Sequence, residues 1–290
     1  MHSGATEDEV MNQESKQPAE TEQPDARGVS DELTDRVSER LTATAETKAQ
    51  GAGDESPGAE TAEKEEVLEE EKVKDEIEIQ IDLLQDPDWV VRREAVITLG
   101  EMGDERCVEP LLKALQDGDW QVREVAIDAL AQVGSPAVEP LIRYLRHWDI
   151  RKYVIKALGK IKDERVLDPL IAQLKSDEFG EDAVEALVEL GSPTVGRLVE
   201  ALKDKEETVQ KRAVIALGRI KDSAALDPLI DMLHHKDWFT RLTAAAAIEK
   251  IGDERGRQAI KSLLKDPDLV VRMRVERILA AWKKQPAGTA

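Results

Sequence analysis

The sequence is poor in aromatic residues and has a single cysteine. Phe, Trp and Tyr together make up 3% of its 290 residues. Cys107 has no partner for an intrachain disulfide, and one chain offers no second thiolate for a metal cluster. Because thiols stay free in reducing compartments, we predict a cytoplasmic location.

Long apolar runs and positive charge are also scarce. No apolar run approaches the roughly 18 residues of a membrane-spanning helix. The first ten residues, MHSGATEDEV, lack the apolar core of a signal peptide. The chain has 41 Lys+Arg against 61 Asp+Glu, a net charge of -20. Nucleic acids and anionic membranes both need positive surface, so the composition argues against them as partners.

The acidic excess is concentrated at the N-terminus. Residues 1–75 contain 22 Asp+Glu and 8 Lys+Arg, a net charge of -14, whereas the remaining 215 residues carry 39 and 33, a net charge of -6. Residues 1–62 have no aromatic residue and are rich in Glu, Thr, Ala and Ser. Such a stretch buries too little apolar surface to offset its ordering entropy. We therefore predict a disordered acidic tail over 1–62 and a flexible C-terminus over 285–290.

From about residue 76 the sequence repeats itself, with a period of 28 to 31 residues. Ala or Val stands four residues before the marker position of each copy, and an apolar residue stands three residues after it. This i, i+4, i+7 spacing is one buried face of a helix, which we call the B helix. The marker residues are Leu99, Leu130, Leu158, Leu187, Leu217, Ile248 and Leu279.

Shorter apolar segments such as LDPLIAQLKS lie between the B helices, and we call them A helices. Proline fits near a helix start, aspartate fits the N-cap and glycine the position after the last turn. One A and B pair cannot bury its apolar face alone, so the pairs must stack. The residues that suit these positions are Pro110, Pro140, Pro169 and Pro228, then Asp88, Asp119, Asp237 and Asp268, then Gly103, Gly134, Gly191 and Gly252.

The repeat resembles a known family. The string D-x-x-V-R-x-x-A-x-x-A-L-G, nearly whole in 88–100 and 119–131, resembles the short HEAT repeats of the phycobilisome-lyase type. The linkers GDER at 103–106 and 252–255, and KDER at 162–165, are similar to that family too. The resemblance implies an all-α, right-handed α-solenoid of about seven HEAT-like repeats over 63–284, with the B helices on the concave face. It also implies a role as a scaffold or in bilin attachment or removal.

The resemblance further implies an Asp/Arg ladder between adjacent repeats. We favour a structural role, in which each arginine satisfies turn carbonyls or a neighbouring aspartate, over an anion-binding row. Gly180 and Gln210 interrupt the ladder, and Arg197 stands where a proline is expected, which predicts a shortened or bent fourth repeat. The ladder position is filled by Arg92, Arg123, Arg151, Arg241 and Arg272.

Four tryptophans form the first candidate binding surface, which we call the tryptophan edge: Trp89, Trp120, Trp148 and Trp238. They share one position, three residues before the ladder position, at the predicted start of a B helix. Exposed aromatic residues often anchor partners. Their regular spacing also suits packing between repeats, which we favour for these residues.

The second candidate surface is the charge stripe, formed by the first, fifth and ninth residues after the ladder position. Its sign alternates from repeat to repeat. Adjacent B helices lie about 10 Å apart, so the stripe can be a zipper of ion pairs between repeats, a surface that recognises a partner of mixed charge, or both. Its candidate residues are Lys152, Lys156, Lys160, Glu181, Glu185, Glu189, Lys211 and Arg219.

A basic cluster with interleaved aromatic residues lies at residues 143–162. Taken alone it resembles a patch for phosphates and stacked bases. The arginines of 143–146 belong to an A helix and the lysines to a B helix, so the cluster is divided between two faces. We therefore disfavour nucleic acid as a partner.

Catalysis finds little support in the motifs. HEAT-type deoxyhypusine hydroxylases carry His-Glu pairs that bind two irons, but Glu follows none of His2, His147, His234 and His235. No P-loop and no nucleophile elbow is present. We predict no catalytic residue, metal or cofactor. The predicted function is a scaffold for a protein partner. An accessory subunit of a bilin-lyase-like or cofactor-maturation system is the alternative, and a deoxyhypusine-hydroxylase-like oxidoreductase is disfavoured.

Overall fold

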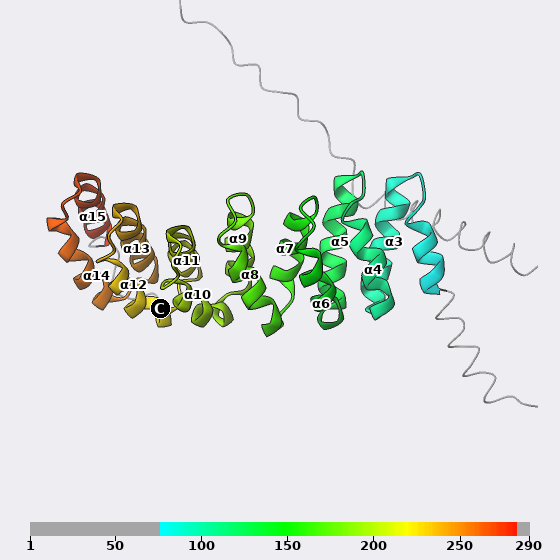
Figure 1. The fold of residues 1–290 in the computed structure, drawn as a ribbon, viewed down its shortest axis with the longest axis horizontal. Helices are drawn as coiled ribbons and strands as arrows, with labels where there is room; N and C mark the ends of the chain where they lie inside the picture. The colour runs from blue at the N-terminus through cyan, green and yellow to red at the C-terminus, as the bar shows by residue number, and fades with distance from the viewer. Residues whose placement is uncertain (1–75, 283–290) are drawn as a thin grey trace, which may run out of the picture. The chain divides into compact units, whose positions relative to one another are not determined.

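The computed structural model describes residues 76–282, shown as a coloured ribbon in Figure 1. The predicted tail over 1–62, the predicted helix start between 62 and 75, and the predicted flexible segment 285–290 lie outside the described residues. None of the helices within the described part is long and apolar enough to cross a membrane. No strand occurs between residues 76 and 282.

Seven helix pairs follow one another along the described residues, as the repeat predicts. The described residues begin with a helical segment at 76–83, which is the A helix of the first pair. The B helices are α3 (Trp89–Met102), α5 (Trp120–Val133), α7 (Arg151–Lys160), α9 (Gly180–Leu190), α11 (Glu207–Ile220), α13 (Trp238–Ile251) and α15 (Leu269–Trp282). The A helices are α4 (Val108–Ala114), α6 (Ser135–Tyr144), α8 (Leu167–Gln173), α10 (Val195–Ala201), α12 (Leu226–Met232) and α14 (Glu254–Ile260).

Short 3-10 turns flank most A helices. They are η1 (Glu105–Cys107), η2 (Glu164–Val166), η3 (Ser192–Thr194), η4 (Ser223–Ala225) and η5 (Lys261–Lys265). Each B helix packs against the next, from α3 and α5 to α13 and α15, and the A helices form a second layer beside them (Figure 1). The marker residues lie in the core between the layers, because six of the seven, Leu99 to Ile248, are fully buried. The predicted all-α solenoid of about seven repeats is confirmed.

The predicted caps begin and end the B helices. Asp88 and Asp119 each accept a hydrogen bond from the backbone N–H two residues later, at 2.9 and 2.8 Å. Gly103 and Gly252 follow α3 and α13 with φ of 64° and 81°, a conformation that costs glycine little. Each B helix of this kind therefore stops within a few residues of where the sequence places its end.

Three B helices approach the next one at a glycine. A Cβ at Gly159 would lie 2.6 Å from the Cβ of Ala186, and a Cβ at Gly218 would lie 2.6 Å from the Cβ of Ala247. Gly100 meets Ala129 in the same way. In all three contacts, the eighth residue after the ladder position meets the sixth residue after the ladder position of the following repeat. The stacking register is therefore the same at these three junctions.

The uneven region is wider than the sequence predicts. α7 and α9 have 10 and 11 residues, whereas the other five B helices have 14. The residues before them, Ile150 and Phe179, make no side-chain cap. The prediction of a short fourth repeat is therefore confirmed, and the third repeat is short as well, because its chain begins the B helix three residues after Trp148.

Candidate partner-binding surface

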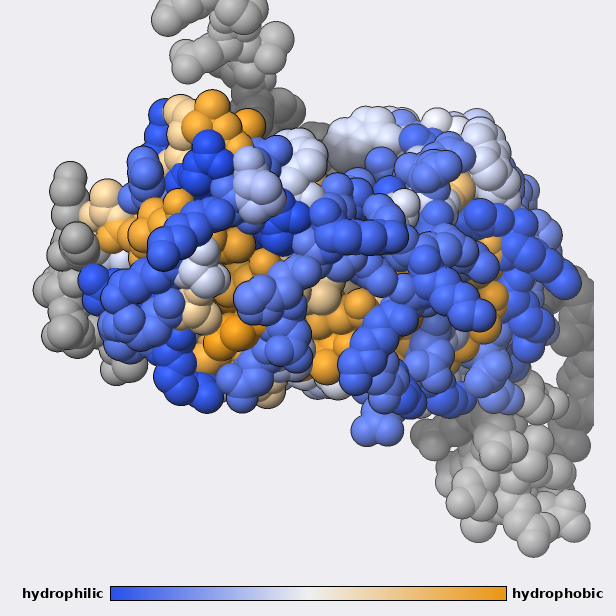
Figure 2. Space-filling view, turned by 60° about the vertical axis from the view of Figure 1, so that its left-hand side comes forward, coloured by the Kyte–Doolittle hydropathy of each residue, from blue (hydrophilic) through white to orange (hydrophobic). Residues whose placement is uncertain are grey.

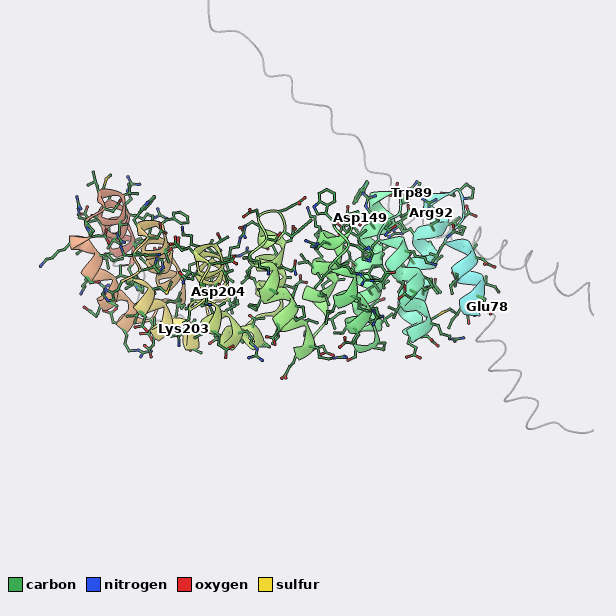
Figure 3. The ribbon with its side chains drawn as sticks, in the orientation of Figure 1. Glu78, Trp89, Arg92, Asp149, Lys203 and Asp204 are labelled. Atoms are coloured by element: carbon green, nitrogen blue, oxygen red, sulfur yellow. The ribbon has the colours of Figure 1, made fainter. Side chains whose placement is uncertain are left out.

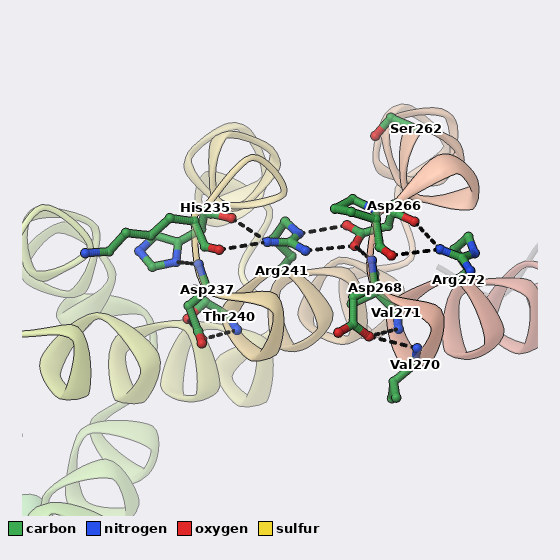
Figure 4. A network of polar contacts seen from close by, with 12 residues as sticks. His235, Asp237, Thr240, Arg241, Ser262, Asp266, Asp268, Val270, Val271 and Arg272 are labelled. Carbon is green, nitrogen blue, oxygen red and sulfur yellow. Dashed lines mark hydrogen bonds and ion pairs between the residues drawn. The ribbon is translucent and has the colours of Figure 1, made fainter.

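The ladder binds adjacent repeats where both of its charges are present. Arg92 donates from Nε and Nη2 to the carboxylate of Asp117 at 2.7 and 2.8 Å, and from Nη1 to the carbonyl oxygen of Asp86 at 2.8 Å. Arg241 makes the same contacts with Asp266, at 2.7 Å from both nitrogens (Figure 4). The predicted structural role of these arginines is confirmed at both junctions.

The arginines favour the charged form of these two aspartates. Only 2% of the Asp266 side chain is exposed. The hydrogen bonds from Arg241 lower the pKa of Asp266, and those from Arg92 lower the pKa of Asp117. Each aspartate also accepts the backbone N–H two residues later, at 2.8 Å. A carboxylate in this position thus joins its own turn to the preceding repeat.

The arginine missing at Gly180 is replaced by one from the next repeat. Arg212 of α11 reaches back and donates from Nη1 to the carbonyl oxygens of Leu174 and Ser176, both at 2.7 Å. A Cβ at Gly180 would overlap its guanidinium group. The sequence prediction that the ladder is interrupted here is correct for position 180, but the contact to the turn carbonyls is kept.

Two other ladder positions use different partners. Gln210 donates to the carbonyl oxygen of Asp204 at 2.5 Å, and its amide oxygen lies 2.9 Å from Nε2 of His235. The Arg151 guanidinium lies 5.1 Å from the ring centre of Phe179, a cation–π contact. These two junctions therefore use a neutral amide or an aromatic ring in place of the Arg–Asp pair.

The charge stripe forms ion pairs between neighbouring B helices. Lys156 lies 3.1 Å from Glu124, and Arg219 donates to both carboxylate oxygens of Glu185. These hydrogen bonds lower the pKa of Glu185. The further pairs of the stripe candidates are Lys160 with Asp128, Arg212 with Glu181, and Lys211 with Asp237. Most of the predicted stripe is thus a zipper between repeats.

Lys152 and Glu189 are the exceptions among the candidate charges. Both are exposed. Among residues 76–282, neither has an ion pair within 4.0 Å, although Glu189 raises the pKa of Lys160 as one of its more distant charges. These two side chains remain available to a partner.

The tryptophan edge is divided between packed and exposed residues. Trp89 is half-buried against the core, at the same end of α3 as Arg92 (Figure 3). Trp120, Trp148 and Trp238 are 63%, 64% and 41% exposed. The preference for packing is therefore right for Trp89 and wrong for Trp120, Trp148 and Trp238, whose rings are exposed. Trp148 lies in the turn before α7, not on the helix.

The exposed tryptophans are held in defined orientations. Nε1 of Trp148 donates to Glu178 at 2.8 Å, and its ring meets Phe179 edge to face at 6.4 Å. Trp238 meets Phe239 in the same way at 5.8 Å. Sequence reasoning missed Phe239, which is 43% exposed. The signal was available, since an aromatic residue follows the tryptophan only in this repeat.

We also located Cys107 and the possible metal-binding side chains among residues 76–282. Cys107 is fully buried, and burial raises the pKa of its thiol. Within residues 76–282, no group of three or more His, Cys, Asp and Glu side chains is placed to hold a metal ion.

Comparison with known families agrees with the repeat. The family model of HEAT repeats matches residues 77–149, 108–190 and 195–280. The chain belongs to the HEAT-repeat family.

Two curated relatives carry the phycobilisome-lyase resemblance further. The chain is 28% identical over 122 residues to phycocyanobilin lyase subunit alpha of Picosynechococcus, which covers 42% of this chain and 35% of that protein. It is 28% identical over 202 residues to phycocyanobilin lyase subunit beta of Thermosynechococcus vestitus, covering 64% of this chain and 86% of that protein. The chain thus spans about a third of the length of the alpha subunit. The predicted kinship with HEAT-like repeats of the lyase type is confirmed.

Solved helical-repeat structures are more distant. An archaeal HEAT-like repeat protein from Thermococcus onnurineus is 14% identical, with 71% of this chain and 97% of that chain covered and a TM-score of 0.39. Human deoxyhypusine hydroxylase is 21% identical, with 72% and 85% covered and a TM-score of 0.37.

Proposed function

We propose that this chain is a protein-binding scaffold and that the tryptophan edge is its contact surface. The observation that carries the proposal is the exposure of Trp120, Trp148 and Trp238, with the rings of Trp148 and Trp238 held against Phe179 and Phe239. Large rings left in water on a stable fold favour burial by a partner, and tryptophan is enriched among residues that dominate binding energy. In this role the chain binds and positions its partner without catalysing a reaction.

The charges beside the edge refine the surface. Lys152 follows Trp148 by four residues, lies in the first turn of α7, and has no ion pair within the described residues. The zipper neutralises Lys156 and Lys160, so the positive surface expected for nucleic acid is reduced. An apolar anchor next to one open cation suits a protein surface with an apolar residue near a carboxylate.

Affinity capture with the full chain tests the proposal. We expect wild-type protein to retain a defined partner, and we expect the double variant Trp120→Ala, Trp148→Ala to lose at least about nine-tenths of it, since two anchors are removed. Lys152→Glu should weaken capture to a smaller degree. Lys250→Glu is the matched control, because Lys250 is an exposed lysine in the last turn of α13, at the opposite end of that helix from Trp238. Equal capture by the double tryptophan variant would reject the edge as the binding site.

A lyase-like accessory role is the second candidate, favoured by the two phycocyanobilin lyase relatives. In that role the bound partner would itself carry, or receive, a tetrapyrrole. Visible absorbance of the captured complex, or transfer of phycocyanobilin to the partner in the presence of the chain, would support it. A partner without absorbance and without transfer would leave the general scaffold as the function.

A further inference from the structure

α15 presents the face that receives a further repeat elsewhere in the molecule. On earlier B helices, the first residue after the ladder position contacts the fifth residue after the ladder position of the following repeat. The fifth residue contacts the ninth residue of the following repeat, counted in the same way. The pairs that define this register are Glu124 with Lys156, Asp128 with Lys160, and Glu185 with Arg219. On α15 these two positions are Met273 and Arg277. Both are exposed, and no B helix among the described residues stacks on them.

The ladder is also incomplete on α15. Arg272 donates from Nη1 to the carbonyl oxygens of Asp266 and Pro267, as its counterparts do in their own turns. Arg92 and Arg241 use Nε and Nη2 for the aspartate of the following repeat. Within residues 76–282, Nε and Nη2 of Arg272 have no such partner. Nε and Nη2 of Arg272, and the side chain of Arg277, can therefore each donate to a carboxylate.

The start of α15 and the segment before it expose apolar side chains. Leu269 is 59% exposed, and Val270 and Leu264 are exposed as well. Figure 2, turned to bring this end of the row forward, shows hydrophobic side chains on it. These side chains add apolar surface that a stacked chain can bury.

The first repeat of the same chain supplies the groups that this face requires. Ile97 and Glu101 are the fifth and ninth residues after its ladder position, so they would meet Met273 and Arg277 in the register above. Glu101 is exposed and supplies the carboxylate opposite Arg277.

We propose that α15 binds the α3 end of a second copy, so that two chains stack head to tail as if they were consecutive repeats. The contact places Arg277 on Glu101 and Met273 on Ile97 of the second copy. The closest approach would join Ala280 to Thr98, a bulkier pair than glycine with alanine. The α13–α15 junction already carries Glu249 and Ile278 at these positions, so the stack accommodates such a pair.

Sedimentation equilibrium of the full chain tests the contact. We expect the average mass to rise with protein concentration and the association to weaken with salt, since an ion pair contributes to it. Arg277→Glu and Glu101→Arg should each lower the association constant at least about tenfold, because each places like charges opposite one another. Mixing the two variants should restore association, since the mixture again contains opposite charges at the junction. Arg274→Glu, on the same helix but outside the register, is the matched control.

Each other outcome overturns the proposal. A monomer at all concentrations would show that the face does not bind a second copy. Association that Arg277→Glu leaves unchanged would place the contact elsewhere. Loss with Arg277→Glu but not with Glu101→Arg would show that α15 binds another surface. Thermal melts of each variant check the fold, and the tryptophan variants should leave the association unchanged, which separates this contact from the proposed function.

Discussion

The outer junctions of the solenoid differ from its middle in how neighbouring repeats are joined. At α3–α5 and α13–α15, an arginine holds the aspartate of the next repeat together with its own turn carbonyls. At α9–α11, Arg212 reaches the turn carbonyls from the following helix, and at α11–α13, Gln210 meets His235. At all four junctions an arginine or glutamine side chain satisfies turn carbonyls. The Arg–Asp pair is an additional contact at the two outer junctions.

Removing the buried carboxylate should cause the largest loss. Asp266→Ala leaves Arg241 without its partner in a nearly buried site, which should destabilise the solenoid by about 3 kcal/mol. Asp204→Ala is the matched control in the middle, because Asp204 is exposed and bonds only its own turn through its side chain. Urea unfolding of both variants checks the difference. Equal losses would mean that outer and middle junctions do not differ in this way.

The replacement in the middle should cost less. Arg212→Leu removes the charged donor from the carbonyl oxygens of Leu174 and Ser176, and we expect a loss of about 2 kcal/mol. Arg197→Leu, an exposed arginine with surface ion pairs only, should lose under about 1 kcal/mol. Hydrogen exchange should show the first loss as faster exchange at the start of α9. No change there would mean that Arg212 does not replace the missing ladder arginine.

Acid should loosen the outer junctions. The pKa values of Asp117 and Asp266 are lowered in the folded state. Their contribution is therefore complete above the unfolded pKa of about 3.9, and it is lost as pH falls toward their folded values. The free energy of unfolding should therefore decrease as pH falls below about 4 and through the folded pKa values of both aspartates. The double variant Asp117→Asn, Asp266→Asn should start lower and depend less on pH. An equal slope would assign the acid sensitivity to other groups.

The exposed zipper should matter least. Breaking the pair of Glu185 and Arg219 should cost about 0.2–1 kcal/mol, because both side chains are partly in water. A double-mutant cycle with Glu185→Ala and Arg219→Ala measures the coupling at low and high salt. Coupling should fall as salt rises. A large, salt-independent coupling would give the stripe the strength of the outer ladder.

The repeat, its caps and most of its stacking could be predicted from the sequence. They depend on local patterns, such as apolar spacing around Leu99 or the aspartate at position 119, which act within one turn of the helix. The two outer ladder pairs follow from the family pattern. The sequence left two interpretations of the stripe open, and the ion pair of Lys156 with Glu124 supports the zipper.

Contacts between non-matching positions could not be predicted. Arg212 stands two residues after its ladder position, so only the stacked geometry shows that it fills the space above Gly180. The exposure of Trp120 depends on how neighbouring repeats pack around the start of α5, and the turn around Trp148 depends on the shortened third repeat. Both are properties of packing across repeats, which a pattern along one chain does not contain.

Titration of the captured partner against purified full chain tests the central claim most directly. Isothermal titration calorimetry would compare wild type with Trp148→Ala. If the tryptophan edge is the contact surface, the dissociation constant should rise about thirtyfold, the effect of losing one dominant anchor of about 2 kcal/mol. A dissociation constant that stays the same, with the variant folded as wild type, would contradict the assignment of the edge as the binding surface.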